Sequence, residues 1–490
     1  MKFSGKIVAL LIVISLIIGA GGSFAAVRLY DKDKQVKQSV NEGASGNREA
    51  QKIISIHDLI EKNYYKKVDG DKLYDGAIKG MIEALHDPFS SYMDPENAKE
   101  FTQSLSSSFK GIGAEVQSLN GKISIVSTIK GSPAEKAGLK SNDQIIAIDG
   151  KTTQGLSINQ AVSKIKGKKG TVVHLQVKRP GISHTLSFNI KRDEIPLKTV
   201  YSKMMKQDRK HIGYINITSF NERTDKEFND ALRKLEDRGM DGLIIDVRNN
   251  PGGYLEAVEH IASQFITKDK PIVQIENRYG KRQSYTSSLE RKKPYPITAL
   301  IDGGTASASE ILSGALKEAG GYPIIGTKSF GKGTVQQGIQ MEDSSELKLT
   351  TFKWLTPDGH WIHKKGIKPT IEVKQPDYFY VSPLSLDKGK VLGYDHTSSK
   401  IKDAQLMLKG SGFDPGREDG YFDKQTDLAV RAFQKKNHLP VTGSIDKKTA
   451  GFLQMGTLKA IENPDNDLQL KEALHVIAEK VNHKKKSVAK

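Results

Sequence analysis

The chain has 490 residues, enough for about three or four domains, and its 37% hydrophobic and 27% charged residues are typical of a folded body that faces water. It contains no cysteine, which excludes disulfides, thiolate metal sites and a cysteine nucleophile. The formal charge of +18 indicates a polyanionic partner, either nucleic acid or an anionic wall polymer or lipid headgroup, unless it serves solubility alone.

The N-terminus predicts export. Residues 1–6 are short and basic, and residues 7–27 carry no charge and are rich in Ile, Leu, Val and Ala. A span of about 20 apolar residues can cross a bilayer, so a retained anchor is favoured over a signal peptide cleaved after Ala25. Lysines before the span place the N-terminus in the cytoplasm and the body outside, which argues against nucleic acid as the partner.

Two helices are predicted after a polar linker. Apolar residues recur at helical spacing from Glu49 onward and again over residues 72–85. These helices lie outside the main domains, so their apolar faces either pack on the body or pair two chains. We expect them to form a homodimer.

Residues 110–192 carry three segments that resemble a PDZ domain. The first is a glycine loop, the second a helix start at residues 132–139, and the third a strand and turn at residues 143–150. Glycines let successive backbone N–H groups point into one cavity, which suits a peptide's C-terminal carboxylate. The resemblance assigns that role to Gly111, Ile112, Gly113 and Ala114.

A glycine turn follows a buried strand at residues 242–247. Gly252 and Gly253 lie between this strand and a helix predicted over residues 255–265. Free N–H groups and the positive end of a helix dipole meet at such a turn, which suits an oxyanion hole. The simpler alternative is a tight turn with no chemical role.

A second strand-to-helix turn follows the strand at residues 297–301. Ser307 lies in this turn, and the adjacent N–H of Ala308 is a candidate second oxyanion donor. Three further hydroxyls are candidates for the nucleophile, namely Thr305, Ser309 and Ser329. Ser309 is better explained as the cap of a helix over residues 309–319, with Glu310 in its first turn.

Lys332 lies between two glycines, 25 residues after Ser307. A lysine can accept the serine proton if burial lowers its pKa from roughly 10.4 toward about 7–8. Gln336 follows four residues later. On a helical turn its amide would lie beside Lys332, whereas on a strand the two would be roughly 13 Å apart.

These segments resemble the carboxyl-terminal processing proteases, a family of Ser-Lys peptidases. The likeness runs from Thr305 to Gln336 and extends over the rest of the chain in the family's order. It implies Ser307 as the nucleophile, Lys332 as the base and Gln336 as the third catalytic member, and it favours the helical geometry for Gln336. It also implies oxyanion donors at the Gly252-Gly253 turn.

The sequence departs from the family at two positions. Asp302 stands where asparagine is usual, and we interpret it as a turn residue. Lys166 stands where arginine is frequent. Since lysine cannot bind two acceptors in a fork, any coupling that it provides between peptide binding and the protease is expected to be weaker, unless it is a plain surface lysine.

Neither a metal site nor a histidine base is favoured. His360 and His363 are three residues apart, with only Asp358 beside them and no third histidine nearby. None of the twelve histidines lies in a motif that would mark it as the base of a Ser-His-Asp triad. We therefore expect no cofactor and no metal.

Residues 399–455 resemble the small helical peptidoglycan-binding domain of wall enzymes. The match includes Asp419-Gly420-Tyr421-Phe422-Asp423, and residues 442–449 echo this turn and the helix start that follows it. The near-repeat predicts two helices that are capped and packed alike. One more helix is predicted over residues 465–481, and the lysines at 484–486 are expected to form a solvated tail.

The sequence thus predicts a multidomain α+β protein. A PDZ domain precedes an α/β protease core of the crotonase and Clp-protease type, and a small all-α wall-binding module follows. The predicted segments are 1–27 (anchor or signal peptide), 28–47 (linker), 48–102 (helical region), 103–192 (PDZ domain), 193–380 (protease core), 396–456 (peptidoglycan-binding-like domain) and 457–490 (helix and basic tail).

We expect an exported serine endopeptidase whose PDZ domain recognises substrate C-termini and gates activity. Its partners would be protein or peptide substrates, the peptidoglycan of the wall, the membrane through the N-terminal segment and a second copy of the chain. Two alternatives stay open at this stage: a catalytically silent PDZ scaffold at the wall, and a hydrolase that acts on peptidoglycan stem peptides.

Overall fold

The computed structural model describes residues 48–119, 122–387 and 389–488. The chain divides into two compact units, one ending at Tyr92 and the other beginning at Met93. Within the described residues no helix is long and apolar enough to cross a membrane. The predicted span at residues 7–27 lies outside these residues.

The first unit confirms both predicted helices, α3 (Arg48–Asn63) and α4 (Gly70–Glu83). Neither helix has a buried residue, and His57 stacks on Tyr74 with ring centroids 4.2 Å apart. Ile54 and Leu59 of α3 keep 49% and 61% of their surface exposed, so an apolar stripe of the helix faces outward.

The PDZ domain of the second unit is built on an antiparallel sheet in the order β3-β4-β5-β7-β8. Its elements are β3 (Ala114–Leu119), β4 (Lys122–Thr128), β5 (Gln144–Ile148), β7 (Val172–Lys178), β8 (Leu186–Lys191), α6 (Pro133–Lys136) and α7 (Ile158–Ile165). A separate pair, β2 (Ser108–Gly111) with β9 (Asp193–Pro196), joins the start and the end of the domain. The predicted helix start at residues 132–139 is present as α6, which Ser132 caps, since the Glu135 N–H donates to Ser132 Oγ at 3.3 Å.

The protease core has a six-stranded sheet in the order β10-β11-β12-β15-β16-β19. Its strands are β10 (Val200–Gln207), β11 (Lys210–Ile217), β12 (Gly242–Asp246), β15 (Ile297–Ile301), β16 (Ile324–Gly326) and β19 (Ile371–Glu372). The pairs from β11 to β19 are parallel, so the ends of β12 and β15 lie at one edge of the sheet. This edge carries the Gly252 and Ser307 turns, as expected for a parallel sheet.

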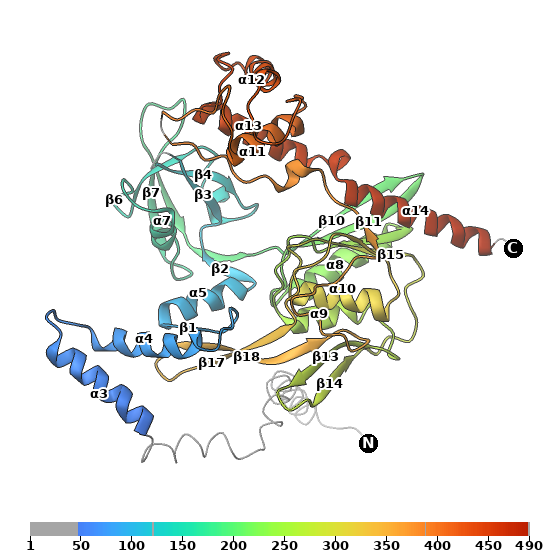
Figure 1. Ribbon diagram of the computed structural model, residues 1–490, viewed down its shortest axis with the longest axis horizontal. Coiled ribbons are helices and arrows are strands. Elements are labelled where there is room, and N and C mark those ends of the chain that lie inside the picture. The colour runs from blue at the N-terminus through green and yellow to red at the C-terminus, as the bar shows by residue number, and fades with distance from the viewer. Residues whose placement is uncertain (1–47, 120–121, 388, 489–490) are drawn as a thin grey trace, which may run out of the picture. The chain divides into compact units, whose positions relative to one another are not determined.

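Both faces of this sheet are covered, because its side chains alternate between two cores. Leu243 and Ile245 of β12 pack against α8 (Thr224–Asp237), α9 (Leu255–Ala262) and α10 (Ala308–Gly314). Ile244 faces the other side, where Ile477 of α14 (Leu468–Val488) packs. Figure 1 shows α14 in red beside β10 and β11. A Cβ at Gly242 would lie only 2.4 Å from Ile477 Cγ2, so α14 is a close-packed layer of the core.

The helix predicted over residues 465–481 is present as α14, and it covers a face of the protease sheet. The backbone of α14 is helical to Val488, so residues 484–486 continue the helix and do not start a separate tail. The sequence showed the helical period, but it carries no information on which surface the helix covers.

The lysine loop is the segment 327–333, which contains Lys332 and lies between β16 and β17. The strands that follow it belong to a second, antiparallel sheet. Its strands include β13 (Pro271–Asn277), β14 (Arg282–Thr286), β17 (Thr334–Gln340) and β18 (Glu346–Leu355). β18 pairs with both β13 and β17.

The C-terminal module confirms the predicted repeat. It contains α11 (Ser399–Gly410), α12 (Lys424–Lys436) and α13 (Lys447–Glu462). The Asp423 and Asp446 carboxylates cap α12 and α13 through Thr426 N and Thr449 N, at 2.8 and 2.7 Å. A buried glutamine, Gln405 or Gln434, accepts a glycine N–H and donates to the helix-start threonine in both repeats.

Candidate active site

Ser307 lies in the turn between β15 and α10, as predicted. Its backbone adopts φ 56° and ψ −118°, a conformation that L-residues rarely take. Ser307 is the N-cap residue of α10, and Ser309 lies inside the helix with its Oγ donating to the Asn250 carbonyl at 2.9 Å. The predicted capping role of Ser309 is therefore wrong, because the helix begins one residue earlier.

The other candidate hydroxyls are buried and hold the backbone. Thr305 is 0% exposed and donates to the Val247 carbonyl at 2.9 Å. Ser329 is 3% exposed and donates to Glu310 Oε1 at 2.6 Å. Of the four candidates, Ser307 alone is half-buried, so it is the one that a substrate can reach.

The backbone of Lys332 is held from two sides. Its N–H donates to Glu310 Oε2 at 2.8 Å, and its carbonyl accepts the Trp354 indole N–H at 2.8 Å. Trp361 donates in the same way to the next carbonyl, that of Gly333, at 2.8 Å. A Cβ at Gly333 would lie 2.7 Å from His363 N, which explains why a glycine stands there.

One buried carboxylate joins the serine turn to the lysine loop. Glu310 is 0% exposed, and its Oε2 accepts the N–H of Ser307 at 2.9 Å as well as that of Lys332. Its Oε1 accepts Ser329 Oγ and the Gly331 N–H, at 2.6 and 2.7 Å. Four donors and the start of α10 compensate the buried charge. The sequence placed Glu310 in the first helical turn, but it gave no sign of the long-range bonds.

Gln336 does not adopt the compact geometry that the resemblance favoured. It lies on β17 next to a register shift between Val335 and Gln336, so the helical-turn prediction is wrong. Its amide donates to Thr334 Oγ1 and Thr350 Oγ1, both at 3.1 Å. These bonds fix the orientation of the amide on the strand.

The glycine turn lies directly beside Ser307. A Cβ at Gly252 would lie 2.9 Å from Ser307 Cβ and 3.0 Å from Ala308 N. Gly252 and Gly253 have φ of 106° and 145°, so both need a glycine.

Two of the three predicted oxyanion donors are available. The Gly252 N–H already donates to Asn250 Oδ1 at 2.9 Å, which removes it from that role in this geometry. The bridge between Phe220 and Gly253 uses the N–H groups of Phe220 and Tyr254, so the Gly253 N–H stays outside the pairing. The Ala308 N–H is at the first residue of α10, where a helix offers no internal acceptor.

Family models match four parts of the chain. Peptidase family S41 matches residues 211–373, and the PDZ domain matches residues 124–179. The peptidoglycan binding domain matches residues 397–453, and the N-terminal domain of the activating protease CtpB matches residues 16–97.

Curated relatives agree over most of the chain. Carboxy-terminal processing protease CtpB of Bacillus subtilis is 51% identical over 96% of this chain and 98% of its own length. Carboxy-terminal processing protease CtpA of the same organism is 45% identical over 89% and 91%. A probable CtpA-like serine protease of Staphylococcus aureus is 38% identical over 84% and 82%.

This chain belongs to the carboxy-terminal processing proteases. It is a serine peptidase with a PDZ domain and a peptidoglycan-binding domain, and the predicted fold class is confirmed.

In this processing protease the glycine loop of the PDZ domain, residues 111–114, is hydrogen-bonded to the start of α6. The Gly113 carbonyl accepts Ser132 Oγ at 3.0 Å, and the Ile112 carbonyl accepts the Ala134 N–H at 2.8 Å. A Cβ at Gly113 would lie 2.4 Å from Ser132 Cβ, so the loop requires that glycine. Lys166 lies next to this loop, with its Cγ 3.9 Å from the position of a Cβ at Gly111.

The segment that contains His360 and His363 supports the lysine loop of the protease. His360 Nδ1 lies 3.2 Å from a Glu318 carboxylate oxygen, and Trp361 between the two histidines holds Gly333. In the part of the chain that the structure describes, no cluster of three His, Cys, Asp or Glu side chains is placed to hold a metal ion.

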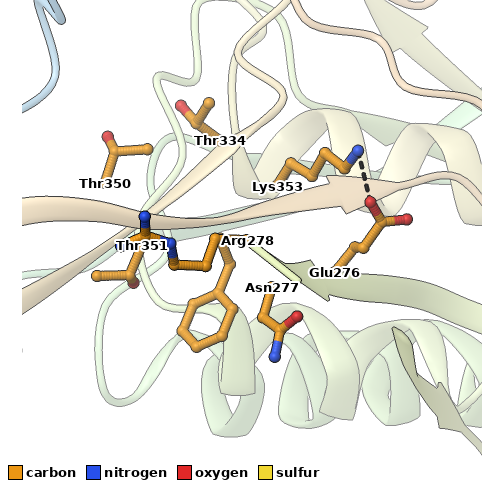
Figure 2. A pocket seen from close by; sticks show the side chains of 8 residues that line it. Glu276, Asn277, Arg278, Thr334, Thr350, Thr351 and Lys353 are labelled. Carbon is orange, nitrogen blue, oxygen red and sulfur yellow. Dashed lines mark ion pairs between the residues drawn. The ribbon is translucent and has the colours of Figure 1, made fainter. Parts of the chain in front are cut away.

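A polar pocket of about 290 Å³ lies between β13, β17 and β18 (Figure 2). Thr334 and Thr350, which hold the Gln336 amide, line one side of it. Glu276 lines the other side and pairs with Lys353 at 2.5 Å. The hydrogen bond from Lys353 and a second one from Arg282 lower the pKa of the Glu276 carboxyl. The pocket therefore carries a fixed charge pair close to the predicted site.

Proposed function

We propose that Ser307 attacks the peptide carbonyl and that Lys332 takes the proton of the Ser307 hydroxyl and returns it to the leaving amine. Gln336 would contact the bound peptide and orient it. The N–H groups of Gly253 and Ala308 would stabilise the oxyanion, a contribution typically worth a factor of about 10²–10³ per donor. The observation that supports this assignment is the single Glu310 carboxylate oxygen that accepts the N–H groups of both Ser307 and Lys332.

The role proposed for Gln336 differs from the one that the resemblance implies. The Gln336 amide N–H₂ is engaged by Thr334 and Thr350, beside the polar pocket. From β17 it would contact the bound peptide and the pocket-lining residues.

Cleavage of an unstructured protein by the full chain tests the assignment. Wild type should cut, and Ser307→Ala and Lys332→Ala should lose nearly all activity. Lys328→Ala is the matched control, because Lys328 is an exposed lysine in the same loop, four residues earlier. Activity in Ser307→Ala would overturn the nucleophile, and a loss in Lys328→Ala equal to that in Lys332→Ala would overturn the base.

We propose that the PDZ domain selects substrates by binding their C-termini. The loop at Gly111 and Gly113 would bind the free C-terminal carboxylate of a substrate, and β3 would pair with its backbone. A peptide and its C-terminally amidated form should then differ in affinity by at least about tenfold. Equal affinities would contradict carboxylate recognition.

The cellular setting is proposed from the sequence. Residues 7–27 would anchor the chain in the membrane with the catalytic body outside, and cleavage after Ala25 would release it instead. The C-terminal module would hold the enzyme near peptidoglycan. The exposed apolar residues of α3 and α4 would pair two copies into a dimer, and Leu59→Glu should then give monomers in analytical ultracentrifugation.

The silent scaffold and the stem-peptide hydrolase are not favoured by the relatives, which are processing proteases. The same assay separates them, since a scaffold cuts nothing and a wall hydrolase releases fragments from purified peptidoglycan but leaves protein intact.

A further inference from the structure

The wall module leaves and rejoins the protease at one point. The chain departs at Gln375, just after β19, and returns at Asp467, just before α14. Gln375 Nε2 donates to Asp467 Oδ1 at 2.6 Å, and the Leu468 N–H donates to Gln375 Oε1 at 3.0 Å. Gln469 Nε2 then donates to the Val373 carbonyl at 2.8 Å. The module is thus an insertion whose two ends are bonded to each other.

The returning segment also reaches Arg248, which starts the glycine turn. Arg248 Nη1 and Nη2 donate to the two oxygens of Asp467, at 2.9 and 2.8 Å. Arg248 Nε and Nη2 donate to Asp246 at the end of β12, at 3.0 and 2.6 Å. Arg248 and Asp467 each keep only 13% of their side-chain surface exposed.

The turn that follows Arg248 is bonded to the serine turn. The Asn250 carbonyl accepts the Ala306 N–H at 3.0 Å and Ser309 Oγ at 2.9 Å, on either side of Ser307. The Asn250 side chain meanwhile holds the Gly252 N–H at 2.9 Å. The glycine turn at Gly252 and Gly253, called the oxyanion turn below, is thus bonded to Arg248 on one side and to the serine turn on the other. A displacement of Arg248 would therefore change the position of the oxyanion turn relative to Ser307.

The second carboxylate is not needed to neutralise the arginine. Asp246 alone already forms a bidentate ion pair with Arg248, which is two residues away in the chain. A buried group of three charges contributes little net stability, since desolvation offsets much of the attraction. What Asp467 adds, together with Gln469 Oε1, which accepts from Arg248 Nη1 at 3.0 Å, is a fixed position for the guanidinium relative to the far face of the sheet.

We propose that Asp467 is a positioning residue of the active site, which acts through Arg248 on the oxyanion turn. The catalytic body of this protease thus includes the segment that returns from the wall module. This proposal rests on the proposed Ser307 mechanism.

The test compares Asp467→Asn with Asp427→Asn in the full chain. Asp427 is the matched control, because it pairs with Arg431 at 2.7 Å within the wall module and touches none of the oxyanion turn. Asp467→Asn leaves Arg248 paired with Asp246, so it should fold. We expect kcat to fall at least about fivefold with KM unchanged, the signature of an interaction made in the transition state. Asp427→Asn should match wild type.

A peptide boronate gives a second readout that a purely structural role would not move. Its tetrahedral boron places a hydroxyl where the oxyanion forms, so Asp467→Asn should weaken its inhibition in step with kcat, and Asp467→Glu should recover part of both.

Three results are informative. Equal kcat in Asp467→Asn and Asp427→Asn overturns the inference, while wild type still cuts and Ser307→Ala does not. Failure of wild type to cut overturns the proposed function instead. If Asp467→Asn does not fold, Gln375→Leu is measured in its place, because it removes the hydrogen bond from Gln375 Nε2 to Asp467 Oδ1. An unchanged kcat in Gln375→Leu overturns the inference.

Discussion

Replacing Glu310 with glutamine should separate the nucleophile from its base. Each carboxylate oxygen of Glu310 accepts two donors, and the side chain is 0% exposed. Glutamine turns one of these oxygens into an NH₂ group, which then faces two donors. Either the Ser329 and Gly331 side or the Ser307 and Lys332 side must lose its bonds.

The expected cost follows from those two lost bonds. A buried donor left without an acceptor costs about 1–3 kcal/mol, so the loss of two bonds should lower the free energy of unfolding by about 2–6 kcal/mol. Misplacement of reacting groups by about 1 Å typically lowers rates by about 10²-fold, and we expect a decrease in kcat of that order with little change in KM.

The assay is steady-state cleavage of a fluorogenic peptide beside a thermal melt. Glu290→Gln is the control, because Glu290 is an exposed acid that pairs with Lys268 at 2.8 Å and has no contact with the serine turn or the lysine loop. Ser329→Ala removes one of the four donors and should give an intermediate loss. A Glu310→Gln enzyme with kcat within about twofold of wild type would refute the reasoning.

Three further results are expected. Gly252→Ala should abolish cleavage, because its Cβ would lie 2.9 Å from Ser307 Cβ at a φ of 106°, whereas Gly451→Ala in α13, whose Cβ meets nothing within 4 Å, should keep activity. Burial, with Glu256 nearby, raises the pKa of the Glu259 carboxyl to about 7 from 4.5. The folded state therefore holds this proton more tightly, and stability should fall as pH rises from 4.5 to 7. Chemical denaturation should find Glu259→Gln about 1–2 kcal/mol more stable than wild type at pH 8 and no more stable at pH 4. This energy is smaller than the full pKa difference implies, because water reaches part of the Glu259 side chain and screens its charge. Gly242→Val should lower the melting temperature by loosening α14, since even a Cβ would lie 2.4 Å from Ile477 Cγ2, and an unchanged melt would contradict the close packing.

The domain order and the Ser307 turn could be predicted because they depend on local patterns. A buried strand, glycines and a helix start are adjacent in the sequence, so the geometry of the turns at Gly252 and Ser307 follows from short-range rules. The resemblance supplied the serine, lysine and glutamine together.

The remaining features depend on contacts between distant segments. The four donors of Glu310 come from residues up to 22 positions away, and Asp467 reaches Arg248 across 219 positions. No periodicity encodes such pairs. The strand at Gln336 was missed for a related reason, since its extended state is set by pairing with β18 and is not set by residues 332–336 themselves.

The two indole contacts give this protein a built-in optical probe. The chain has only two tryptophans, and both donate to carbonyls of the lysine loop, Trp354 to Lys332 and Trp361 to Gly333. The tryptophan fluorescence of the whole molecule therefore originates from two indoles that both contact one loop of the candidate site. A change in emission on adding substrate or peptide would report movement of that loop in real time, with no dye attached and no background from the other domains.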